Sequence, residues 1–209
     1  MNEKRNGALD RYPIEKMRAG RPSVTVKEDG AVIFYLYAPA AKIVQVAGLG
    51  GYFTNKKIDL MPDGQGGFFA EVKDFHWGMH YYFWYVDGVR ICNPYAGISY
   101  GCFAAINTFE VQEKNVDFYF AKDIPHGTVS ICKYVSKVSS HLKECYVYTP
   151  YGYEEGDERY PVLYLQHGVG ESETGWIWQG KANLIMDCLI AEGKCEKMIV
   201  VMSSLLSNK

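Results

Sequence analysis

The sequence lacks the long apolar runs that take a chain into or across a membrane. No stretch approaches the roughly 20 apolar residues of a membrane span. No run of signal-peptide length follows the basic residues near Met1. We therefore expect a soluble protein, and the absence of an export signal favours the cytoplasm.

The chain also lacks an excess of charge of either sign. The 22 Lys and Arg residues are balanced by 24 Asp and Glu residues, giving a formal net charge of -2, and the basic residues are spread along the chain. Nucleic acids and anionic membranes are bound by clustered basic residues. We therefore expect neither as a partner.

Metal-ligand and disulfide spacings are missing too. The six cysteines show no C-x-x-C pair and are dispersed through apolar segments, which favours reduced, buried thiols. His76 and His80 have the spacing of a helical metal site, but Gly78 between them favours a turn. We expect no metal and no cofactor. The cysteines are Cys92, Cys102, Cys132, Cys145, Cys188 and Cys195.

Aromatic residues are abundant, with 17 Tyr, 10 Phe and 4 Trp, and they favour strands or supply flat faces for sugar rings. After a polar arm at 1–22, short apolar runs alternate with turn sequences such as Val86-Asp-Gly88. This pattern predicts a β-sandwich of immunoglobulin type over 23–122. The expected strands are 23–27, 31–38, 43–47, 68–72, 80–86, 104–111 and 117–120, with 89–92 completing a hairpin.

The character of the sequence changes after a linker at 123–127. Two extended runs lead to an apolar strand at 161–166, a helix at 183–192 that ends at Gly193, and another apolar strand at 198–202. Strand, helix, strand predicts a parallel βαβ unit. The two extended runs are 128–137 and 144–148.

Four segments of this second part are specific: Asp123-Ile-Pro-His-Gly-Thr-Val, Tyr146-Val-Tyr-Thr-Pro-Tyr-Gly-Tyr, Leu165-Gln-His-Gly-Val-Gly-Glu-Ser-Glu-Thr-Gly-Trp176 and Ala182-Asn-Leu-Ile-Met-Asp. They resemble carbohydrate esterase family 1 and the enterochelin-esterase-like hydrolases. Tyr81-Tyr-Phe-Trp-Tyr-Val-Asp-Gly88 resembles the E-set, or glycogen-binding-like, immunoglobulin module that often precedes such enzymes. The resemblance implies a mixed fold class: an N-terminal immunoglobulin-like β-sandwich, followed by the first part of an α/β-hydrolase fold at 123–209.

The resemblance also implies an activity, the hydrolysis of acyl esters on carbohydrates, as in feruloyl or acetyl xylan esterases. A strand that ends in a Gly-rich turn lets backbone N–H groups approach a developing oxyanion, so Gly168, Val169 and Gly170 are oxyanion-hole candidates. Trp176 and Trp178 are candidates for the wall of the acyl or sugar pocket, although packing against the following helix explains them equally well.

The catalytic triad is not found. In this fold the nucleophilic serine follows the strand at 198–202 and a further helix, and Ser203-Ser-Leu-Leu-Ser-Asn-Lys209 departs from the family pattern. We therefore expect a truncated or frameshifted chain that is inactive alone. Gly97-Ile-Ser-Tyr-Gly101 fits G-x-S-x-G, but an extended run follows it instead of a helix. We expect Ser99 to lie in a surface loop of the sandwich.

Alternation along 80–86 places Tyr82 and Trp84 on one face of a strand and Tyr81, Phe83 and Tyr85 on the other. One face must be core, and the other docks on the hydrolase part or stacks on a glycan, with Tyr82 and Trp84 as the glycan-stacking candidates. A non-catalytic carbohydrate-binding or interaction module is thus the alternative function. The expected partners are an acylated polysaccharide and, through an exposed edge at 161–166, a second copy of the chain.

Overall fold

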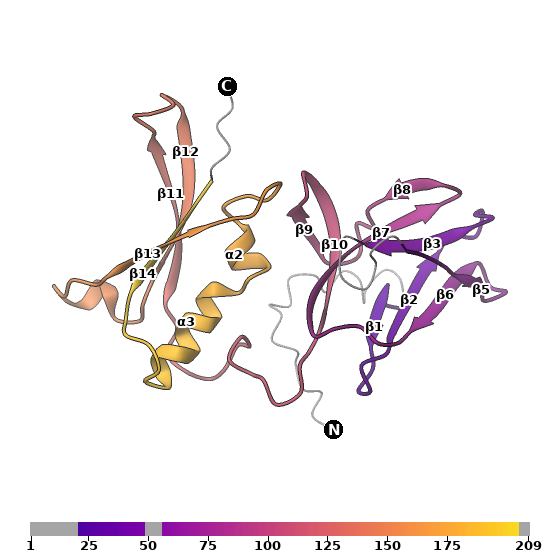
Figure 1. The fold of residues 1–209 in the computed structure, drawn as a ribbon, viewed down its shortest axis with the longest axis horizontal. Helices are drawn as coiled ribbons and strands as arrows, with labels where there is room; N and C mark the ends of the chain where they lie inside the picture. Colours follow the sequence, from indigo (N-terminus) through magenta and orange to yellow (C-terminus); the bar gives the residue numbers. More distant parts are fainter. Residues whose placement is uncertain (1–20, 49–55, 205–209) are drawn as a thin grey trace. The chain divides into compact units, whose positions relative to one another are not determined.

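A computed structural model describes residues 21–48 and 56–204, so nearly all of the predicted arm at 1–22 lies outside the described residues. The chain is mostly β-sheet with few helices (Figure 1). It divides into two compact units, each considered by itself. One unit extends to Ser99 and includes Ala105–Val116, and the other comprises Tyr100–Ala104 and the chain from Asp117 onward.

Two β-sheets make up the first unit, although residues 100, 101 and 104 of their strands are grouped with the second. Their strands pair antiparallel at β1–β2, β2–β6, β3–β7 and β7–β10. The first sheet has the order β1 (Val24–Val26), β2 (Val32–Tyr37), β6 (Gly67–Val72), β5 (Met61–Pro62). The second has the order β4 (Lys57–Asp59), β3 (Val44–Gly48), β7 (Gly78–Val86), β10 (Ala104–Val111), β9 (Ile98–Gly101), with β8 (Val89–Ile91) paired to β7.

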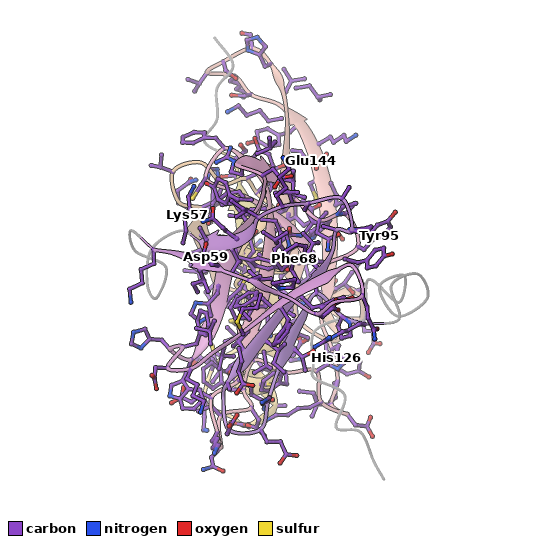
Figure 2. The ribbon with its side chains drawn as sticks, turned by 90° about the vertical axis from the view of Figure 1, so that its right-hand side faces the viewer. Lys57, Asp59, Phe68, Tyr95, His126 and Glu144 are labelled. Atoms are coloured by element: carbon purple, nitrogen blue, oxygen red, sulfur yellow. The ribbon has the colours of Figure 1, made fainter. Side chains whose placement is uncertain are left out.

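The inner faces of the two sheets share one hydrophobic core. Phe34 of β2 meets Tyr82, Trp84 and Phe109 of the facing sheet edge-on, with ring centroids 5.7, 6.2 and 5.5 Å away. Phe68 of β6 completes this core (Figure 2). Edge-on pairs are the favoured geometry for aromatic rings, so the aromatic alternation of β7 stabilises the packing of one sheet on the other.

The outer face of the second sheet is polar at its rim. The ammonium group of Lys57 lies 3.9 Å from the ring centroid of Tyr85, and Gln45 Nε2 donates to Asp59 Oδ1 at 2.7 Å. Lys57 and Asp59 both belong to the edge strand β4 (Figure 2). Charged side chains on an edge strand hinder its pairing with other chains.

Most of the predicted strands are confirmed, but the strand at 117–120 is wrong. Phe120 N donates to Asp117 O at 3.1 Å, which closes a turn. The rings of Phe118, Tyr119 and Phe120 contact one another in sequence, and strand propensity alone does not form a strand without a partner. The sequence reading missed β4, β5 and β9, which have three, two and four residues.

A four-stranded sheet forms the centre of the second unit. Its order is β11 (Thr128–Val135), β12 (Leu142–Thr149), β14 (Ile199–Ser203), β13 (Val162–Gln166). One face is covered by α2 (Gly175–Trp178) and α3 (Ala182–Ala191) (Figure 1). A 3-10 turn, η2 (Tyr153–Glu155), precedes β13.

The predicted parallel unit is confirmed. Strands β13 and β14 pair in parallel, with Val162 opposite Ile199, and α3 lies between them in the chain. Gly193 adopts a φ of 66°, the left-handed conformation expected after a helix end. Within the described ranges, β13 is the end strand of its sheet, and no helix is long and apolar enough to cross a membrane.

Candidate functional site

The Gly-rich turn predicted as an oxyanion site follows β13 directly. Gly170 is buried with a φ of 83°, a conformation that side chains disfavour, whereas Val169 is 89% exposed. Glu171 N donates to Gly168 O at 3.2 Å, which closes the turn. His167 Nδ1 donates to the same carbonyl at 2.8 Å, so this histidine stabilises the turn. The turn thereby holds its backbone at the end of a strand, with Val169 as its most exposed residue.

Trp176 is tied to the same place. Its Nε1 donates to Gln166 O, the last residue of β13, at 3.0 Å. Ile177 turns into the core, whereas Trp176 and Trp178 remain 36% and 43% exposed. Both tryptophans therefore keep accessible surface on α2, the short helix that follows the Gly-rich turn.

The glycan-stacking candidates on β7 are a wrong prediction. Tyr82 and Trp84 are both 0% exposed and belong to the core shared by the two sheets. A side chain without exposed surface cannot stack on a sugar. The alternation itself was read correctly, but the face that points inward was not identified.

The predictions for Ser99 are confirmed in one respect and wrong in another. The extended run after it is confirmed as β10, so the strand–turn–helix elbow that a nucleophile requires is not formed there. The prediction of a surface loop is wrong, because Ser99 lies within strand β9 and is 8% exposed.

The expectation of uniformly buried thiols is also wrong. All six cysteines are free, but Cys102 and Cys132 are exposed, and only Cys145 and Cys188 are buried among the described residues. Cys132 lies on the end strand β11, of which almost every residue is exposed, and Cys102 lies between β9 and β10. Apolar neighbours in the sequence therefore do not ensure burial.

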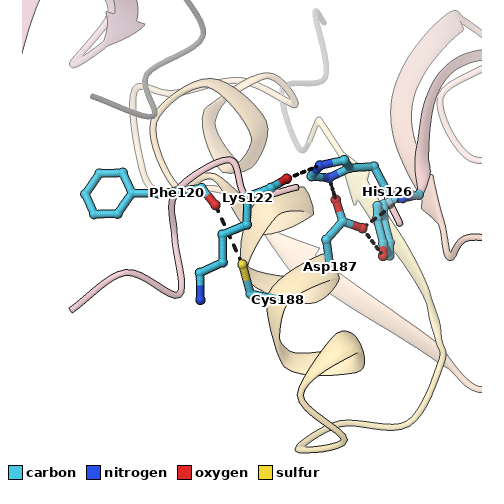
Figure 3. A network of polar contacts seen from close by, with 7 residues as sticks. Phe120, Lys122, His126, Asp187 and Cys188 are labelled. Atoms are coloured by element: carbon cyan, nitrogen blue, oxygen red, sulfur yellow. Dashed lines mark hydrogen bonds and ion pairs between the residues drawn. The ribbon is translucent and has the colours of Figure 1, made fainter. Parts of the chain in front are cut away.

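The most extensive polar network of the second unit is centred on Asp187 of α3 (Figure 3). Its side chain is 3% exposed and accepts three hydrogen bonds, all at 2.8 Å. The donors are His126 Nδ1, Gly127 N and the hydroxyl of Tyr148 on β12. The carboxylate thus joins the linker, the helix and the sheet, and its burial is offset by charge-assisted hydrogen bonds.

The partners of His126 define its protonation. Nδ1 faces the Asp187 carboxylate and Nε2 lies 2.9 Å from Lys122 O, and both partners accept hydrogen bonds only. Both ring nitrogens therefore donate, as in an imidazolium. The hydrogen bond to Asp187 is the main reason that the pKa of His126 lies above its ordinary value of 6.5. Burial and then the hydrogen bond to Asp187 raise the pKa of the Tyr148 hydroxyl far above its usual range.

This arrangement resembles the base and its orienting acid in a catalytic triad, but it cannot act as one. A general base needs a free ring nitrogen that faces the nucleophile, and Nε2 of His126 is occupied by the Lys122 carbonyl. The network instead fastens the linker to α3. Lys122 adds exposed ion pairs to Asp117 and Glu192, both at 3.1 Å, and Cys188 Sγ donates to Phe120 O at 3.6 Å.

The sequence analysis did not find this network. One signal was available: Asp187 is a single carboxylate within Ala182-Asn-Leu-Ile-Met-Asp-Cys-Leu-Ile-Ala191, an otherwise largely apolar helix. A charge at such a position is buried only with partners. Those partners lie 39 to 61 residues away in the sequence, so periodicity could not identify them.

Comparison with known proteins relates this part of the chain to esterases. Residues 139–209, which contain the Gly-rich turn, α2 and α3, match the family model described as "Putative esterase". The chain carries an esterase-family sequence. A curated protein of Xylanibacter ruminicola, an endo-1,4-beta-xylanase/feruloyl esterase, is 38% identical over 206 residues, which make up 95% of the chain and 28% of that protein.

Solved structures agree on the fold. The enterobactin esterase of Shigella flexneri matches 85% of the chain with a TM-score of 0.60 at 12% identity. The ferric enterobactin esterase of Salmonella typhimurium matches 91% with a TM-score of 0.58 at 11% identity. The esterase-family chain spans 28% of the curated relative and 52% and 58% of these two structures.

Proposed function

We propose that this chain contributes to an esterase that hydrolyses acyl esters on carbohydrates, of the feruloyl or acetyl xylan esterase type. The observation that carries the proposal is the 38% identity to a xylanase/feruloyl esterase along almost the whole chain. The substrate on this proposal is an acylated polysaccharide. Its reaction is attack of an activated hydroxyl on the ester carbonyl, with negative charge developing on the carbonyl oxygen.

The two units have separate roles in this proposal. Residues 23–122 form an immunoglobulin-like E-set module, and 123–209 form the opening part of an α/β-hydrolase domain. Two antiparallel sheets around one core support the first assignment. The parallel β13–β14 pair, with α2 and α3 between the two strands in the chain, supports the second.

In this role, the N–H groups of Gly168, Val169 and Gly170 are the candidates that face the developing oxyanion. The turn stands at the carboxyl end of β13, where ligands of parallel sheets bind. Trp176 and Trp178 offer aromatic surface on the next helix, which fits a planar feruloyl group or a sugar ring.

The 209-residue chain alone is expected not to hydrolyse esters. Ser99 lies in a hairpin strand and His126 has no free ring nitrogen, so neither can serve as nucleophile or base. The test is an assay of the purified chain and its Ser99→Ala variant with a chromogenic acetyl ester and a feruloyl ester. Turnover by the chain that disappears in Ser99→Ala would overturn this assignment.

Self-association through β13 is a further part of the proposal. Val162 and Tyr164 of this end strand are 45% and 74% exposed, and an apolar parallel strand is normally covered on both sides. Sedimentation should show concentration-dependent dimers that a Tyr164→Lys substitution abolishes. A monomer at all concentrations would contradict the self-association.

A further inference from the structure

Two cysteines face each other across neighbouring strands of the second unit. Strands β11 and β12 pair antiparallel, and their register places Cys132 directly opposite Cys145. Cys132 is exposed to solvent, whereas Cys145 is 7% exposed. One thiol is thus open to a dissolved reagent and the other is held behind it.

The spacing of such a pair suits a covalent bond. Directly opposite residues of an antiparallel pair have Cα atoms roughly 4.5 to 5.5 Å apart, within the approximate 4.4 to 6.8 Å that disulfides span. The register places both side chains on the same face of the sheet, and burial, followed by the charge and hydrogen bond of Cys132, raises the pKa of the Cys145 thiol. In the next pair of the register, Lys133 Nζ lies 3.9 Å from Oε2 of Glu144, which is labelled in Figure 2.

The other cysteines lack this arrangement. Within the described part of the chain, Cys188 is on a helix and donates to Phe120 O, and Cys195 donates to Glu196 O at 3.2 Å. Cys92 and Cys102 lie outside the strands. The strand pairing therefore distinguishes one pair of thiols from the remaining four.

We propose that Cys132 and Cys145 form an oxidisable dithiol that closes to a cross-strand disulfide in the presence of a small-molecule disulfide such as oxidised glutathione. The exposed Cys132 thiolate attacks one sulfur of the oxidant and releases one glutathione thiol. The Cys145 thiolate then attacks the Cys132 sulfur of the mixed disulfide and releases the second. The protein loses two protons and two electrons, and the oxidant is reduced to two thiols.

The structural consequence concerns the end strand β11. Within the described sheet, β11 is hydrogen-bonded to β12 alone, and seven of its eight residues are exposed, all except Val129. Strands of this kind open locally at low free-energy cost. A covalent link from Cys132 to Cys145 would restrict that opening, so the redox state of the surroundings would set how firmly β11 is held.

Mass spectrometry of trypsin digests tests the proposal. Cleavage after Lys122, Lys133, Lys143 and Arg159 yields peptides 123–133 and 144–159, each with one cysteine. After treatment of the full chain with oxidised glutathione and blocking of free thiols, these peptides should be joined. Because the pair is held in place, we expect its link to exceed any other cysteine pairing by roughly tenfold.

Matched variants separate the outcomes. Cys102→Ser removes an exposed thiol outside the pair and should leave the link intact, whereas Cys132→Ser should abolish it. Cys145→Ser should leave Cys132 as a stable mixed disulfide with glutathione. Hydrogen exchange in 128–135 should slow on oxidation of the natural chain but not of Cys132→Ser. Glutathione retained on Cys132 of the natural chain without a link, or equal linking among all six cysteines, would overturn the proposal.

Discussion

Removing the buried carboxylate of Asp187 should break the hydrogen bonds that hold the linker at 123–127 to α3. In Asp187→Ala, the Gly127 N–H and the Tyr148 hydroxyl lose a charged acceptor that is 3% exposed. His126 also loses its partner, but its side chain is 42% exposed and water can replace part of that bond. Leaving a buried N–H or hydroxyl group without its acceptor costs about 1–3 kcal/mol. We expect a loss of that size in the local free energy of unfolding.

Hydrogen exchange measured by peptide is the suitable assay, because it gives an opening free energy for each segment. Peptides from α3 and from 123–133 should exchange faster in Asp187→Ala, while those from β7 in the other unit serve as an internal reference. Glu192→Gln is the matched control, since its ion pair with Lys122 is exposed and screened by solvent and contributes little to stability. A change below about 1 kcal/mol in Asp187→Ala would refute the assigned role of the network.

Three further predictions concern single residues. The pKa of His126 is raised, so its pairing stabilises the unit fully below the ordinary value of 6.5 and weakens as the pH rises through the higher folded value. His126→Gln should therefore remove this fall of the urea midpoint with rising pH above 6.5. Gly127→Ala should destabilise by about 1–3 kcal/mol in urea unfolding, because its Cβ would clash with the Thr149 carbonyl. Asn107→Leu should cost about 1–3 kcal/mol by the same measurement, because it leaves the buried Asn93 N–H without its acceptor.

Local patterns were sufficient for much of the fold. Aromatic alternation predicted β7, and apolar runs separated by a helical period predicted the parallel pair of β13 and β14. Both signals arise from the periodicity of side chains along one element. Where that periodicity extends over few residues, as in β4, β5 and β9, the sequence signal was too short to detect.

These local patterns could not predict which face of a strand is buried, or which residues distant in the sequence are in contact. Alternation separates Tyr82 and Trp84 from their neighbours on β7, but it does not tell which face the second sheet covers. The Gly-rich turn could be located from the sequence because all its residues are adjacent. The Asp187 network could not, because it joins three segments through tertiary packing.

The central claim, that the Gly-rich turn belongs to carbohydrate-ester hydrolysis, is tested most directly in a chimera. Residues 1–203 of this chain would be joined to the residues that follow the matched region in the Xylanibacter ruminicola relative, and release of ferulate from a feruloylated oligosaccharide measured. We expect turnover. Val169→Pro removes one backbone donor and should lower kcat about 10²- to 10³-fold, while Val169→Ala should retain it. A folded chimera without turnover, or one unaffected by Val169→Pro, Gly168→Pro and Gly170→Pro alike, would contradict the account.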